Sequence, residues 1–154
     1  MIQLEHGECR LARLRDGRLL AWQRYGLPEG RPVYFFHGFP GSRLQAAFLA
    51  EDARNAGVAL FSFDRPGFGR STAAPKRTLL DWADDVEQLA DQLRHGRFDV
   101  VGVSCGGPYA LACAHRLGTR VDHVALLAGI GLDLPRGFIW VLMILLVASV
   151  AIRQ

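Results

Sequence analysis

The chain has 154 residues, of which 50% are apolar and 21% charged, with a formal net charge of +3 at pH 7. This length fits a single domain with its own core, and the composition excludes a disordered chain. The arginines are spread among acidic residues without a basic block, so the charge does not indicate a nucleic-acid partner.

Two features of the sequence bear on the cellular compartment in which the protein resides. The first ten residues, MIQLEHGECR, lack the apolar core of a signal peptide. The three cysteines, Cys9, Cys105 and Cys113, are an odd number without CxxC or metal-type spacing, which favours free thiols in a reducing compartment. We therefore expect a cytoplasmic protein.

The first half of the chain predicts a hairpin followed by a strand–helix–strand unit. Apolar-rich runs over 9–14 and 18–25 flank the turn signal Asp16-Gly17. The runs RPVYFF (31–36) and VALFSF (58–63) are typical of parallel strands covered on both faces. Between them we expect a helix, with Ser42 and Gln45 spaced as a capping box and Gly57 as its stop. Strand, helix and strand in this order form a βαβ unit.

The pattern then repeats. A second helix is predicted between Thr78 as cap and Gly96, with one apolar face made of Leu79, Trp82, Val86, Leu89 and Leu93. A strand (FDVVGV, 98–103), a helix from Gly106 to Leu117 closed by Gly118, and a strand in HVALLAG (123–129) follow. The prediction is an α/β fold with a doubly wound, mostly parallel sheet and an N-terminal β-hairpin, which binds ligands at the carboxyl ends of its strands.

The C-terminal stretch GFIWVLMILLVASVAI (137–152) is apolar throughout. As a helix it would measure roughly 24 Å at ~1.5 Å per residue, which is short for a hydrocarbon core of about 30 Å. We expect a buried helix or the first helix of a lid, so that residues 1–134 form the core and 135–154 this helix. Self-association through an uncovered helix and membrane attachment are the alternatives.

Three loops after predicted strands carry the candidate chemistry: HGFPGS, DRPGFGRS and GVSCGG. The last fits G-x-S-x-G through Gly102, Ser104 and Gly106, a strand-to-helix turn that exposes a serine nucleophile and needs small flanking residues. A helix N-terminus there also favours negative charge. Cys105 is a weaker nucleophile candidate, because Val103 stands two positions before it. Glycine-rich turns are common, so the motif alone is not specific.

A reacting carbonyl oxygen needs two hydrogen-bond donors where its negative charge develops. We assign one to the backbone N–H of Cys105, after the serine. The other is the N–H of Phe39, in the loop after the third strand.

In this order and spacing the three motifs resemble the α/β-hydrolase fold family over residues 17–129, especially its lid-bearing esterases and proline-iminopeptidase-like peptidases. The resemblance implies Ser104 as nucleophile, the N–H groups of Phe39 and Cys105 as oxyanion hole, a small-molecule acyl substrate, and no cofactor or metal. A serine at this position argues against dehalogenase and epoxide hydrolase chemistry, for which this fold carries an aspartate.

The resemblance also implies supporting roles. His37 is expected to shape the oxyanion loop rather than transfer protons. Asp64 and Arg65 are expected to brace the loop after the fourth strand, with a simple turn as the alternative.

The partners of the serine are harder to find. A catalytic triad in this fold runs serine, acid, histidine, and only His115 and His123 follow Ser104. His115 lies roughly 16 Å along the helix, and His123 about 17–20 Å away at the opposite sheet edge, whereas a general base must lie within ~3 Å. Asp133 is a candidate acid, although a loop residue at the entry to a lid is the favoured interpretation.

We therefore expect the amino-terminal part of a serine hydrolase, either a truncated gene product or a fragment, that is weakly active or inactive alone. One alternative is a non-catalytic family member that binds a small apolar ligand or a protein partner. A membrane-attached fragment is the other.

Overall fold

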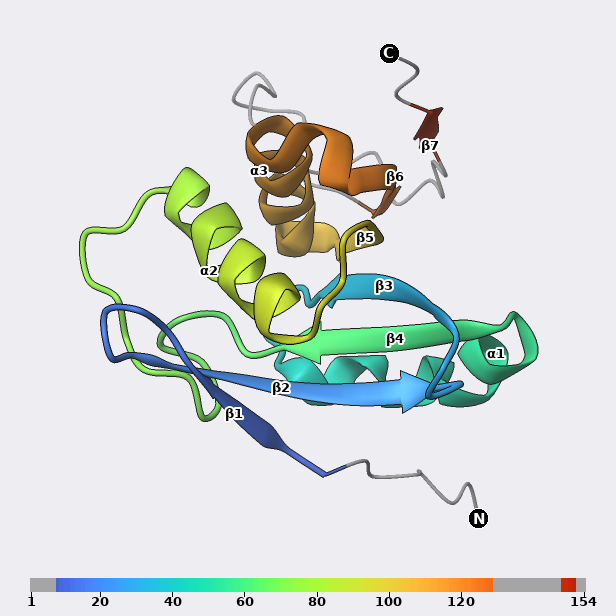
Figure 1. Ribbon diagram of the computed structural model, residues 1–154, viewed down its shortest axis with the longest axis horizontal. Helices are drawn as coiled ribbons and strands as arrows, with labels where there is room; N and C mark the ends of the chain where they lie inside the picture. Colours follow the sequence, from blue (N-terminus) through green and yellow to red (C-terminus); the bar gives the residue numbers. More distant parts are fainter. Residues whose placement is uncertain (1–7, 129–147, 152–154) are drawn as a thin grey trace.

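The computed structural model describes residues 8–128 and the backbone of residues 148–151. Within these residues one sheet has the strand order β1-β2-β4-β3-β5-β6-β7 (Figure 1). Strands β3, β4, β5 and β6 are parallel, whereas β1, β2 and β7 run antiparallel to their neighbours. The strands are β1 (Arg10–Arg13), β2 (Leu19–Gly26), β3 (Arg31–Phe36), β4 (Val58–Phe63), β5 (Phe98–Val103), β6 (Val121–Leu127) and β7 (Ala148–Ala151).

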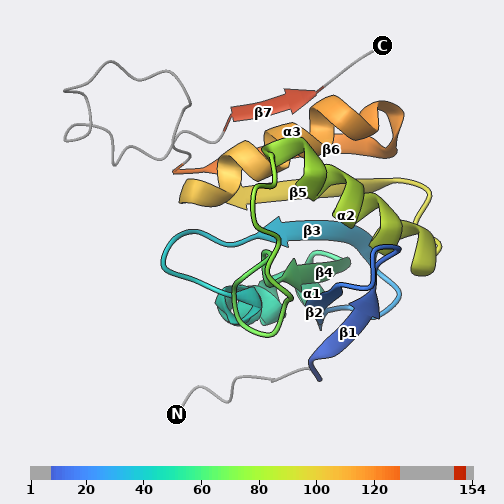
Figure 2. The ribbon, with the colours of Figure 1, turned by 90° about the vertical axis from the view of Figure 1, so that its left-hand side faces the viewer.

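Helices cover both faces of this sheet, which confirms the predicted α/β class. Helices α2 (Leu79–Gln92) and α3 (Gly107–Leu117) pack on one face, and the short 3₁₀ helix η1 (Arg43–Leu49) with α1 (Ala50–Asn55) on the other (Figure 2). Each face has its own apolar cluster. Trp82 and Phe63 belong to the larger cluster, under α2 and α3, and Phe35 and Ala46 to the smaller one. Cys113 of α3 is fully buried in the larger cluster.

The N-terminal hairpin forms where it was predicted. The N–H of Leu14 donates to the carbonyl of Arg18 (2.8 Å), and the N–H of Gly17 donates to that of Leu14 (3.0 Å). Gly17 has a φ of 86°, a left-handed conformation that glycine adopts without steric cost.

The second predicted helix is confirmed as α2, with a capping box. The Thr78 hydroxyl accepts from the N–H of Asp81, and the Asp81 carboxylate accepts from the N–H of Thr78 at 2.6 Å. The helix ends differently from the prediction, because Arg94 (φ 59°) and not Gly96 takes the left-handed position after its last turn. The third helix, α3, ends at Gly118 (φ 49°) as expected.

The first predicted helix is only partly confirmed. Ser42 caps it, accepting from the N–H of Leu44, and Gly57 (φ 72°) follows it. However, the segment is a 3₁₀ helix before it becomes α1, and the predicted capping box is wrong. The Gln45 side chain accepts from the N–H of Gly38 at 2.8 Å, so it faces the loop after β3 rather than its own helix end.

The prediction of one helix over 137–152 is wrong at Ala148–Ala151. These residues form β7, which pairs antiparallel with β6 from Leu126↔Ala148 to His123↔Ala151. The physical reason is the open edge of β6, whose backbone groups need hydrogen-bond partners that a helix does not supply. Residues 137–147 and 152 lie outside the described residues. Within the part of the chain that is described, no helix is long and apolar enough to cross a membrane.

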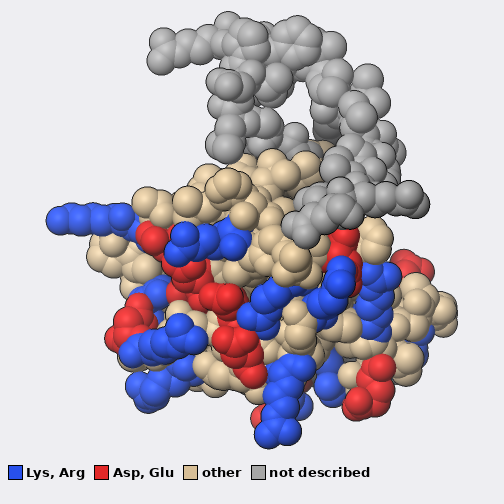
Figure 3. Space-filling model, turned by 45° about the horizontal axis from the view of Figure 1, so that its top comes forward, with Lys and Arg blue, Asp and Glu red and all other residues tan. Residues whose placement is uncertain are grey.

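The surface charges are mixed. Figure 3 shows Lys and Arg interspersed with Asp and Glu over the face in view, without a continuous basic area.

Candidate active site

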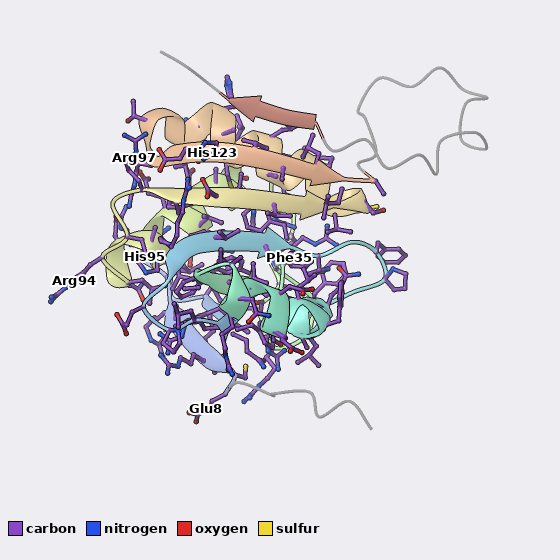
Figure 4. The ribbon with its side chains drawn as sticks, turned by 90° about the vertical axis from the view of Figure 1, so that its right-hand side faces the viewer. Glu8, Phe35, Arg94, His95, Arg97 and His123 are labelled. Atoms are coloured by element: carbon purple, nitrogen blue, oxygen red, sulfur yellow. The ribbon has the colours of Figure 1, made fainter. Side chains whose placement is uncertain are left out.

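The three motif-bearing loops meet at one edge of the sheet. Strands β3, β4 and β5 are parallel neighbours, so their last residues, Phe36, Phe63 and Val103, end at the same edge. The register pairs Phe36 with Gly102, which brings the loop after β3 beside the loop after β5. The arrowheads of β3 and β5 point the same way in Figure 4.

Ser104 occupies a strained turn, as its motif predicts. It follows β5 directly, and its φ of 49° is a left-handed conformation that is rare for a residue with a side chain. A 3₁₀ turn over Ser104–Gly106 then leads into α3. The strained backbone turns the chain sharply from strand into helix.

Two glycines make this turn possible. A Cβ on Gly102 would lie 2.6 Å from the carbonyl oxygen of Gly106, and one on Gly106 would overlap the carbonyl oxygen of Phe36. The prediction that both positions need a small residue is therefore confirmed, and the contacts leave no room even for a Cβ.

The loop after β3 approaches Ser104 closely. A Cβ on Gly38 would lie 3.3 Å from the Cβ of Ser104 and 3.4 Å from the carbonyl oxygen of Val103. Phe39 is 68% exposed. The structure thus brings Phe39, Ser104 and Cys105 to one place. Convergence of the N–H groups of Phe39 and Cys105 on a single point stays a prediction.

His37 lies buried beneath this loop. Its Nδ1 is 2.8 Å from the carbonyl oxygen of Gly38, a contact in which Nδ1–H donates. Burial, above all, lowers the pKa of His37 below its usual 6.5, and the nearby Arg65 lowers it further. A neutral imidazole that donates to the loop backbone agrees with the structural role expected from the resemblance.

Asp64 and Arg65 brace the loops, so the alternative of a simple turn is excluded. The Asp64 carboxylate is fully buried and accepts from the N–H of Arg43 (2.8 Å), its guanidinium (2.6 Å) and the N–H of Arg70 (2.9 Å). Arg65 donates to the carbonyl oxygens of Gly38 (3.1 Å) and Cys105 (3.3 Å).

The histidines that follow Ser104 lie elsewhere. Nδ1 of His123 is 2.7 Å from the Arg31 guanidinium and 2.8 Å from the Asp99 carboxylate, where β3 and β5 begin. Figure 4 shows His123 at that opposite edge, together with His95. His115 is exposed near the far end of α3. Both exclusions made from the sequence are confirmed, and Asp133 lies outside the described residues.

Sequence reasoning missed two contributors to the site. Gln45, which fixes the N–H of Gly38, was assigned to a capping box because its spacing from Ser42 fits that motif. Tyr109 of α3 lies under the Arg65 guanidinium, 4.7 Å from ring centroid to Cζ. No local pattern marks such a long-range ring contact.

A cavity among the described residues lies away from the three loops. It has a volume of about 500 Å³ and lies between the hairpin and the start of α2, and its lining includes the ion pair of Arg18 and Asp85 (2.6 Å) but no residue of the three loops. In the described ranges 8–128 and 148–151, no group of three or more His, Cys, Asp or Glu is placed to hold a metal ion.

Comparisons with known proteins agree with this architecture. A family model described as alpha/beta hydrolase fold matches residues 31–143. The chain is 33% identical over 121 residues to a proline iminopeptidase of Arabidopsis thaliana, covering 74% of this chain and 30% of the relative. It is 32% identical over 125 residues to one of Neisseria meningitidis, covering 77% and 39%. The chain thus spans about a third of the length of the curated relatives it matches.

Solved structures give the same result. The structure titled Est816 as an N-acyl homoserine lactone degrading enzyme superposes with a TM-score of 0.66 at 28% identity, covering 80% of this chain and 45% of that chain. Residues 31–143, which the family model matches, contain β3 to β6 and all three loops described above. The chain belongs to the α/β-hydrolase fold family.

Proposed function

We propose that this chain carries the nucleophile and the oxyanion hole of a serine hydrolase that acts on an ester, amide or similar acyl bond of a small molecule. The observation that carries the proposal is the turn at Ser104. Its φ of 49°, its two sterically required glycines and the approach of Gly38 are what a nucleophile elbow beside an oxyanion loop requires.

The chemistry follows from this arrangement. The Ser104 hydroxyl oxygen attacks the substrate carbonyl carbon, and the C=O π electrons move to the oxygen. The N–H groups of Phe39 and Cys105 donate to that oxyanion and so stabilise the tetrahedral intermediate. The serine proton passes to a base within hydrogen-bond reach and then to the leaving alcohol or amine, which departs as its bond to the carbonyl carbon breaks. Water then hydrolyses the acyl group from Ser104. In the described part of the chain, no histidine after Ser104 lies at this edge.

The relatives support the acyl class. Two are named proline iminopeptidases, and a structural neighbour is titled as an N-acyl homoserine lactone degrading enzyme. Within the described residues, no histidine that follows Ser104 lies at this edge, which favours one second candidate, a family member that binds an acyl compound without turning it over.

Hydrolysis of p-nitrophenyl acetate by the purified chain and by Ser104→Ala tests the proposal. We expect slow turnover that Ser104→Ala lowers but does not abolish, because an oxyanion hole and binding alone leave ~10³–10⁴-fold over water when a triad member is missing. Cys105→Ala is the matched control: it keeps the backbone N–H and should keep the rate.

A fluorophosphonate probe followed by peptide mass spectrometry identifies the nucleophile directly. Modification of Ser104 is the expected result. Modification of Cys105 instead, or equal rates for the chain and Ser104→Ala, would overturn the proposal. Saturable binding of an ester without Ser104-dependent turnover would establish the non-catalytic candidate.

A further inference from the structure

The Arg65 guanidinium is a buried cation without an acidic partner. Arg65 is 3% exposed, and among the described residues no carboxylate lies within ion-pair distance of it. Burial, above all, lowers its pKa below the usual value of an arginine. An isolated buried charge is energetically costly. The hydrogen bonds that Arg65 makes in place of an ion pair therefore identify the segments that it holds together.

Those contacts join two loops. One guanidinium nitrogen donates to the carbonyl oxygen of Cys105 (3.3 Å), in the Ser104 turn. The other donates to the carbonyl oxygen of Gly38 (3.1 Å), in the loop after β3. The flat cation lies near the rings of Phe68 (4.8 Å) and Tyr109 (4.7 Å), which favours it by cation–π attraction and restricts its position.

The Gly38 carbonyl belongs to the same peptide group as the N–H of Phe39. This peptide is trans, and in a planar trans peptide the C=O and N–H point in opposite directions. A cation that holds the Gly38 oxygen therefore directs the Phe39 N–H away from itself. It also polarises the group, because hydrogen bonds along a chain strengthen one another. The Gly38 N–H, in the preceding peptide of the same loop, donates to Gln45, so its exchange with solvent reports how often this loop opens.

We infer that Arg65 is a positioning residue of the oxyanion hole: it clamps the loop after β3 to the Ser104 turn and orients and polarises the Phe39 N–H. The inference rests on the proposed function for its catalytic consequence, while the clamp itself is a property of the fold. A lysine does not replace Arg65, because an ammonium group lacks the planar fork that reaches two carbonyls while it contacts the rings of Phe68 and Tyr109.

The test compares Arg65→Met and Arg65→Lys with Arg77→Met in the full chain. Arg77 is the matched control: its guanidinium lies 5.3 Å from the same Tyr109 ring and donates to its hydroxyl (3.2 Å). It makes no hydrogen bond to Gly38 or Cys105 within the described residues. Two quantities are measured: Ser104-dependent hydrolysis of p-nitrophenyl acetate, and hydrogen exchange at the Gly38 amide.

For both Arg65 variants we expect kcat to fall at least tenfold with KM within about twofold, since removing one oxyanion donor outright costs ~10²–10³ in kcat. If Arg65 had only a structural role, a folded variant would not show a fall in kcat with KM nearly unchanged. The Gly38 amide should exchange several-fold faster, and Arg77→Met should change neither quantity. If Arg65→Met does not fold, Arg65→Lys keeps the charge and carries the same expectations.

Unchanged kcat and unchanged Gly38 exchange in the Arg65 variants, or equal losses in Arg77→Met, would overturn the inference. Failure of the proposed function is distinguishable, because Ser104→Ala would then hydrolyse the ester as fast as the unmodified chain. In that case the exchange rate of the Gly38 amide still tests the clamp, and an unchanged rate in the Arg65 variants would refute it.

Discussion

Polar residues at the two edges of the parallel strands differ in how deeply they are buried. At the carboxyl edge His37, Asp64 and Arg65 are buried and bonded to the backbone of neighbouring loops. At the amino edge Arg31 and His123 have half-exposed side chains that pair in contact with water. Burying polar groups is energetically costly, and hydrogen bonds offset only part of that cost. The polar groups at the carboxyl edge therefore lower the stability of the fold while they fix the geometry of the loops.

The largest expected effect at the carboxyl edge is that of Asp64→Ala. It leaves the Arg43 guanidinium and two backbone N–H groups without their buried acceptor. Breaking a buried pair by removing one partner costs about 3–5 kcal/mol, and urea unfolding measures this loss. Asp64→Asn, which keeps an acceptor oxygen, should lose less. A loss below about 1 kcal/mol for Asp64→Ala, as for a surface pair, would remove the contrast between the edges.

Gly106→Ala ranks next. The added methyl group would overlap the carbonyl oxygen of Phe36, an atom of the central strand that has little freedom to move. We expect a loss of roughly 1–3 kcal/mol or more, typical of overpacking. Gly96→Ala is the control, because nothing lies within 4 Å of the Cβ it would add. Equal unfolding midpoints for the two variants would contradict the close approach at the elbow.

The pH dependence of stability tests a property that the two edges share. Burial lowers the pKa of His37 at the carboxyl edge and of His95 at the amino edge below 6.5. Below pH 6.5 the unfolded chain binds more protons than the folded one, so the free energy of unfolding falls as the pH drops from about 7 to 5. Above this window the two histidines contribute no slope.

Unfolding in urea at several pH values between 5 and 8 measures that slope. His37→Asn and His95→Gln should each reduce it, and the double variant should reduce it most. A slope unchanged in His37→Asn would mean that His37 is not held neutral beneath the oxyanion loop.

The smallest effect is expected at the amino edge. Asp99→Ala removes the carboxylate that contacts the half-exposed Arg31 and His123. Exposed ion pairs contribute about 0–1 kcal/mol, so the unfolding free energy should change by no more than ~1 kcal/mol and the change should shrink further in 0.5 M salt. A loss as large as that of Asp64→Ala would show that the two edges are energetically alike.

The features that the sequence predicted are those with a local cause. The Asp16-Gly17 turn, the Thr78–Asp81 capping box and the glycines around Ser104 each depend on residues a few positions apart. For the same reason the order of strands and helices, and with it the meeting of the three loops, followed from short patterns.

The features that were missed depend on partners outside their own helix or strand. Gln45 has the right spacing to cap its own helix, yet the N–H of Gly38 in the preceding loop is the donor it binds. Ala148–Ala151 continues an apolar run with helical length, yet the open edge of β6 selects a strand. In both cases a backbone group of another segment decides which of two locally satisfactory structures forms.

Because Cys113 is buried, its reaction with a thiol reagent reports the separation of α3 from the sheet. This thiol is enclosed between α3 and the sheet, and burial raises its pKa, so little reactive thiolate is present while the helix is docked. Cys9 and Cys105 are partly exposed. A thiol reagent therefore modifies those two in the native protein and reaches Cys113 only when α3 detaches from the sheet. The labelling rate of Cys113 thus measures how often the helix that begins at the Ser104 turn separates from the core.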